Sequence, residues 1–170
     1  DYRRTAVQEG EKSPTREYII VPGHDPSRAR LLAGNLASQG IEVRRAVDAT
    51  KVGPRAIPQN AYVVSNAQPA GRLVRNLLDP HTAQDDPFVK EQDRLRRLRL
   101  GDQIYDVTAW SLPLLFDVEV LTSAAPFPGK TVPVMPGRGA ADRVGIRGGR
   151  GGYLVPWGSA AAAGAPGVLP

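Results

Sequence analysis

Two histidines, His24 and His81, are the residues whose side chains are best suited to metal chemistry. A zinc hydrolase needs histidine and carboxylate ligands in a tight group, two of them usually at short spacing, and a further carboxylate to accept the proton of the bound water. Neither histidine is followed by a glutamate at such a spacing, since the local sequences are His-Asp-Pro-Ser and His-Thr-Ala-Gln. We therefore predict that both lie in exposed turns and that this chain holds no metal or cofactor of its own.

Other catalytic groups give no stronger signal. The chain has no cysteine, which excludes disulfides, thiolate metal sites and cysteine nucleophiles. No serine lies in a Gly-x-Ser-x-Gly elbow, and the glycines between 145 and 152 lack the Lys-Ser/Thr ending of a phosphate-binding loop. We predict no catalytic residue.

Two groups of arginines could bind anions. Arginine clusters and Arg-Gly-Gly segments bind RNA through charge and stacking, so a small basic RNA-binding protein is the alternative function. However, arginines at the end of a helix also complement its dipole, and the net charge of +5 is a modest excess of 22 basic over 17 acidic residues. We therefore do not expect a nucleic-acid partner. The candidate anion-binding residues are Arg94, Arg96, Arg97, Arg99, Arg147 and Arg150.

A mixture of aromatic and polar residues at 105–110 is the most distinctive part of the chain. Tyr105, Asp106, Thr108 and Trp110 could face a ligand cleft or another domain. Alternatively, Asp106 or Thr108 caps the turn that follows while the aromatic rings fill the core. We favour the structural interpretation.

The periodicity of residues 17–46 predicts a strand, a crossover helix and a parallel strand. Residues 17–22 are a short β-branched and aromatic run that ends at a Pro-Gly turn. Asp25 can cap a helix that starts at Pro26 and runs through Ala37, and Gly40 stops it. Residues 41–46 then alternate apolar and polar side chains, as a second strand does.

A second strand and helix follow residues 51–60, which are expected to form a loop. The strand is predicted at 61–65 and the helix from Pro69 to the Asp-Pro pair at 79–80. An exposed amphipathic helix is expected at 85–99. The apolar segment at 104–120 is expected to be buried against the sheet or against a neighbouring domain, with a further strand at 118–122. Together the elements predict an α/β fold with a small, mostly parallel sheet, built from one βαβ unit and a further strand-helix unit.

The ends of the chain are expected to be irregular. We assign 1–16 to a linker or to the end of a preceding element, and 17–122 to an α/β accessory domain. The Gly/Pro-rich stretch 123–152 is expected to be a linker, and 153–170 the truncated start of a further strand-helix unit. No apolar run approaches the length of a membrane span, so no membrane partner is expected.

Four motifs carry a resemblance to a known family. They are Tyr-Val-Val at 62–64, Ala-Gln-Pro-Ala-Gly-Arg-Leu at 67–73, Asp-Val-Thr-Ala-Trp-Ser-Leu-Pro-Leu at 106–114 and Tyr-Leu-Val-Pro-Trp-Gly at 153–158. The chain resembles, roughly from Glu17 to Ala163, the region downstream of the peptidase domain in large bacterial carboxypeptidase A-like zinc metallopeptidases. In that family the region resembles a glutamine-amidotransferase-like α/β module.

The resemblance implies a non-catalytic accessory segment. The zinc, its ligands and the catalytic glutamate of such proteins belong to the preceding peptidase domain, which would be the partner of this segment, and none of them maps to a position here. Amidase chemistry would need a nucleophilic cysteine, which this chain lacks. Asp117 and the residues after Ala163 depart from the expected pattern, and a truncation or frame change would explain the ending. The resemblance implies a secreted or periplasmic location if the parent carries a signal peptide.

Overall fold

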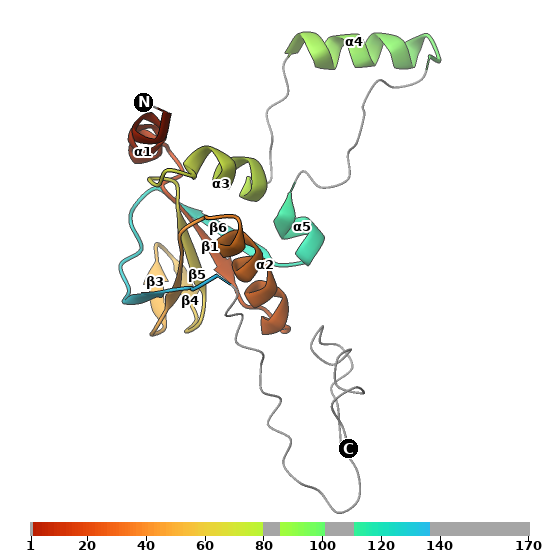
Figure 1. The fold of residues 1–170 in the computed structure, drawn as a ribbon. Coiled ribbons are helices and arrows are strands. Elements are labelled where there is room, and N and C mark those ends of the chain that lie inside the picture. The colour runs from red at the N-terminus through yellow and green to blue at the C-terminus, as the bar shows by residue number, and fades with distance from the viewer. Residues whose placement is uncertain (1, 80–85, 101–110, 137–170) are drawn as a thin grey trace, which may run out of the picture.

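The computed structural model describes residues 2–79, 86–100 and 111–136. Figure 1 shows a central sheet with helices on one face and a small hairpin on the other. The sheet has five strands in the order β6-β1-β5-β2-β7. Their bounds are β1 Glu17–Val21, β2 Val43–Ala46, β5 Tyr62–Ser65, β6 Glu119–Ser123 and β7 Thr131–Pro133.

The prediction of a mostly parallel sheet is wrong, because every neighbouring pair in this sheet is antiparallel. β1 and β2 run in the same direction, but β5 lies between them and pairs antiparallel with both. This is a split βαβ unit, and the order β1-α2-β2-β5-α3-β6 follows the ferredoxin-like pattern. Periodicity located β1 and β2. It did not show that β5, which follows both in the chain, lies between them in the sheet.

Three helices cover one face of the sheet and form the larger core with it. They are α2 Pro26–Ser38, α3 Gly71–Leu78 and α5 Leu112–Phe116. The predicted helix start is confirmed, since Asp25 caps α2 and Pro26 is its first residue. The fully buried members of this core are Tyr18, Ile20, Ala29, Leu32, Ala33, Leu36, Val64, Val74 and Leu78.

A hairpin covers the opposite face, although its residues were expected to form a loop. β3 Thr50–Val52 and β4 Arg55–Ile57 pair antiparallel, and Gly53 takes a positive φ of 55° at the first position of the turn. Ile57 of the hairpin and Phe127 belong to a second core. Its other buried members, which lie in the sheet or directly before β5, are Ile19, Ala46, Ala61 and Val63. Phe127 and β7 both fall within 123–152, the range that the sequence assigned to a linker.

Two further helices complete the described elements. α1 Tyr2–Lys12 occupies most of the range assigned to a linker or preceding element, and it lies beside α3 (Figure 1). α4 Asp86–Arg97 is the predicted amphipathic helix, with Gln92 and Leu95 as its buried residues. Within the described ranges, no helix is both long and apolar enough to cross a membrane.

Candidate functional site

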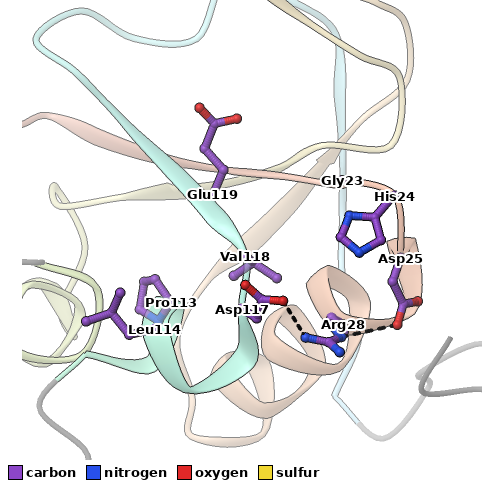
Figure 2. A pocket seen from close by; sticks show the side chains of 9 residues that line it. All are labelled: Gly23, His24, Asp25, Arg28, Pro113, Leu114, Asp117, Val118 and Glu119. Atoms are coloured by element: carbon purple, nitrogen blue, oxygen red, sulfur yellow. Dashed lines mark hydrogen bonds and ion pairs between the residues drawn. The ribbon is translucent and has the colours of Figure 1, made fainter. Parts of the chain in front are cut away.

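A cleft of about 370 Å³ lies between the start of α2 and the end of α5. Figure 2 shows the side chains that line it, which come from the turn after β1, from α2, from α5 and from the start of β6. They are Gly23, His24, Asp25, Arg28, Pro113, Leu114, Asp117, Val118 and Glu119. Its lining includes one imidazole, one guanidinium and three carboxylates.

Asp25 and Arg28 are engaged in joining two helix ends. Buried Asp25 accepts hydrogen bonds from the Ser27 amide at 3.1 Å and the Ser27 hydroxyl at 2.5 Å, while Arg28 Nε lies 3.3 Å from its second oxygen. Arg28 Nη1 also donates to Asp117 Oδ2 at 2.7 Å, as Figure 2 shows. Asp117 ends α5 in the left-handed conformation, with φ at 51°. The arginine therefore ties the first turn of α2 to the C-cap residue of α5.

The histidine of the cleft belongs to no cluster of potential metal ligands among the described residues. His24 is exposed in its turn, as predicted, and His81 lies outside the described residues. Among the residues described, no group of three or more His, Cys, Asp or Glu side chains lies close enough together to hold a metal ion. Glu119 at the cleft edge pairs with Arg55 of the hairpin at 2.5 Å. The charges of the cleft thus serve mainly as cross-links between elements.

The outer side of α5 is apolar and exposed. Leu112 and Phe116 pack against the larger core, whereas Leu114 is 77% exposed and Leu115 is 63% exposed. The Arg28–Asp117 pair links the end of this helix to α2, although the Asp117 side chain is 72% exposed. We call Leu114 and Leu115 the α5 leucine pair. Adjacent exposed leucines on a positioned helix are typical of a contact surface for another protein.

The motif at 67–73 has a structural role. The Gln68 side chain is 2% exposed, and its Oε1 accepts from the Glu42 amide at 2.7 Å. Its Nε2 donates to the carbonyls of Ser65 at 2.7 Å and Glu42 at 3.2 Å. The side chain thus joins the end of β5 to the residue before β2 and gives hydrogen-bond partners to backbone groups of both.

Glycines of this region allow α1 and α3 to approach the same carbonyl. A Cβ atom on Gly71 would lie 2.1 Å from the Asn66 carbonyl oxygen, and one on Gly10 would lie 2.0 Å from it. Arg72 then donates two hydrogen bonds to Glu9 of α1, at 2.9 and 2.7 Å, and its guanidinium stacks 4.3 Å from the Tyr2 ring centre. The Arg72 hydrogen bonds lower the pKa of Glu9. α1 is therefore seated on the domain by close backbone contact and by charge.

The buried carboxylate of Glu17 connects β1 to β2 and to the segment that carries Phe127. It is 3% exposed at the start of β1, and Arg44 of β2 donates to its Oε1 at 2.5 Å. The Phe127 amide donates to its Oε2 at 2.6 Å. Because both carboxylate oxygens accept a hydrogen bond inside the protein, Glu17 is a structural group that holds the 124–130 segment on the sheet.

The arginines proposed to bind anions lie only partly within the described residues. In α4, exposed Arg94 donates two hydrogen bonds to Glu91, both at 2.9 Å, and these lower the pKa of Glu91. Arg97 and Arg99 are exposed, and Arg96 takes part in a further interaction. Arg147 and Arg150 lie outside the described residues, as do Tyr105, Asp106, Thr108 and Trp110.

The sequence reasoning did not find the main elements of this site. The cleft and the α5 leucine pair depend on Arg28 meeting Asp117 across 89 positions of the chain. The signals that were available were the capping sequence at Asp25 and the interruption of the apolar run by Asp117. Comparisons of the chain with known protein families, with curated proteins and with solved structures gave no match.

Proposed function

We propose that this chain is a non-catalytic packing unit of a zinc carboxypeptidase-like protein and that it contacts the catalytic domain through the α5 leucine pair. The observation that carries the proposal is the exposure of Leu114 and Leu115 on a helix whose end is fixed by an ion pair. Fully burying one leucine is worth roughly 1.5–3 kcal/mol. Covering both would therefore contribute substantially to an interface.

The use of the buried polar groups supports the same role. Gln68, Glu17 and Asp25 each have their hydrogen-bonding atoms engaged with backbone or with a neighbouring side chain. Groups that are occupied in this way stabilise the fold, and they are poorly placed to act on a substrate. The catalytic zinc and its ligands would then reside in the partner domain, as the family resemblance implies.

The test is co-purification of the tagged chain with a zinc carboxypeptidase-like domain encoded upstream in the same reading frame. We expect the chain to retain this domain, and the double variant Leu114→Asn, Leu115→Asn to lose at least about tenfold in affinity. The matched control is Leu31→Asn with Leu98→Asn, which alters two leucines that are also exposed, at 50% and 55%. Equal loss in both double variants, or no capture at all, contradicts the proposal.

The non-catalytic part of the proposal has its own measurement. The purified chain is assayed for zinc content and for release of C-terminal amino acids from peptides. Stoichiometric zinc together with turnover would overturn it. Binding of single-stranded RNA that weakens with salt and is lost on replacing Arg94 and Arg97 by alanine would instead favour the RNA-binding alternative.

A further inference from the structure

The two edges of the main sheet differ in how they are protected. β7, at one edge, has three residues, follows Lys130 and ends in Pro133. Short length, lysine and proline are the usual devices that prevent an edge strand from pairing with another chain. β6, at the other edge, has five residues, Glu-Val-Leu-Thr-Ser, with neither lysine nor proline. Among the described residues β6 pairs only with β1.

The side chains of β6 are suited to strand pairing. Val120 and Thr122 are β-branched, and Val120 and Leu121 remain only partly buried because no strand covers their outer side. Val120 packs toward the helix core and Leu121 toward the hairpin core, so a further strand would extend both layers. The single charge of the strand, on Glu119, is held by Arg55.

We propose that β6 pairs antiparallel with β6 of a second copy of this chain, about a two-fold axis at Leu121. This inference goes beyond the proposed function and uses different residues. In the proposed register Leu121 lies opposite its own copy, Val120 opposite Thr122, and Glu119 opposite Ser123. The central pair is therefore apolar, the next pairs are β-branched on both sides, and the outer pairs place one carboxylate opposite a hydroxyl, so no pair brings two like charges face to face.

The charge pattern of β6 favours a second copy as the occupant. The two Glu119 residues would lie four positions apart along the paired strands, or about 14 Å at roughly 3.4 Å per residue. That separation exceeds the screening length of about 8–10 Å at physiological salt, so their repulsion is small. The strand is thus complementary to itself, as a two-fold interface requires.

The first test is the molar mass of the chain in solution, by light scattering or sedimentation, from about 5 to about 500 μM, where interfaces of modest area associate. We expect a monomer–dimer equilibrium. Thr122→Lys should weaken the dimer at least about tenfold, because a lysine on an edge strand opposes pairing with another chain. Val132→Lys places the same change on the β7 edge, where Val132 is 37% exposed, and should leave the equilibrium unchanged. Circular dichroism checks that both variants are folded.

Cross-linking tests the register, and the absence of cysteine from the chain makes it unambiguous. Opposed residues of antiparallel strands have Cα atoms about 4.5–5.5 Å apart, within the range that a disulfide spans. Leu121→Cys should therefore give a covalent dimer on mild oxidation, and Val132→Cys should not. A chain that stays monomeric throughout, or equal cross-linking of the two variants, overturns the proposal. If the chain alone is monomeric but Thr122→Lys abolishes capture of the catalytic domain, β6 is the binding edge for that domain. Self-association is then likewise overturned.

Discussion

At the scale of single residues, buried polar side chains hold segments together that hydrophobic contact alone would leave loose. Gln68 is the clearest case, since its amide group bonds to both backbone groups of Glu42 and to the Ser65 carbonyl. A backbone group that loses a buried partner costs about 1–3 kcal/mol. Beyond the antiparallel ladder that joins β5 and β2, Gln68 therefore adds a side-chain link between the end of β5 and Glu42.

Replacing Gln68 by alanine should lower the free energy of unfolding by about 2–4 kcal/mol, because three buried hydrogen bonds are lost and a cavity is left. Urea denaturation followed by circular dichroism measures the change. Gln39→Ala is the control, since Gln39 is exposed and should change stability by less than about 0.5 kcal/mol. Similar effects of the two substitutions would show that Gln68 does not have this role.

Sequence reasoning at this scale succeeded where the interaction is local. Asp25 was predicted to cap α2, and it does, because a cap involves residues two positions apart. Asp117 could be seen only as an interruption of an apolar run, because its partner Arg28 is brought near by the tertiary fold. The sequence predicted that the apolar segment is buried against the sheet or against a neighbouring domain, but it did not indicate that Leu114 and Leu115 are the exposed residues.

At the scale of elements, hydrophobic periodicity located strands and helices but not strand partners. The first strand, its helix and the second strand were placed within two residues of their observed bounds. Adjacent parallel pairing was then the natural inference, and the insertion of β5 between the two strands overturned it. β3, β4 and β7 have three residues each, too few for alternation to be recognised.

The seating of α1 provides a prediction at this scale, since it requires glycine at position 10. Gly10→Ala raises helix propensity but places a methyl group against the Asn66 carbonyl, so we expect a loss of about 1–3 kcal/mol. Gly34→Ala in α2 is the matched control, because a Cβ there meets nothing within 4 Å and should stabilise the chain by about 0.5–1 kcal/mol. Urea denaturation should give shifts of opposite sign. Stabilisation by both substitutions would mean that α1 does not pack against this loop.

At the scale of the whole molecule, the hairpin and the 124–130 segment close the face of the sheet that faces away from the helices. RNA-binding sheets of four strands present aromatic side chains on an open face, where bases stack. The face of this sheet that carries Ile19 and Val63 is not open in this way, because both residues are fully buried in the second core. In the part of the chain that the structure describes, an RNA-binding function would therefore have no stacking surface on this face of the sheet.

The second core also determines where the folded unit ends, and a substitution at Phe127 tests this boundary. Its ring is 7% exposed, and its amide is bonded to buried Glu17, although the sequence placed it in a Gly/Pro-rich linker. Phe127→Ala should lower the free energy of unfolding by about 3–5 kcal/mol, as expected for removal of a buried aromatic ring. Phe88→Ala is the control, because Phe88 lies on α4 and is 39% exposed.

The comparison of these two variants by urea denaturation decides between two boundaries. If 123–136 were a linker, both substitutions would cost less than about 1 kcal/mol, as at ordinary surface positions. A large effect of Phe127→Ala alone means that the unit extends at least to β7 and that Glu17 gains its second hydrogen bond only when this segment is in place. Glycine and proline in that segment then serve to bring the chain across the sheet. Gly129 is an instance, since a Cβ there would lie 2.7 Å from the Phe127 ring.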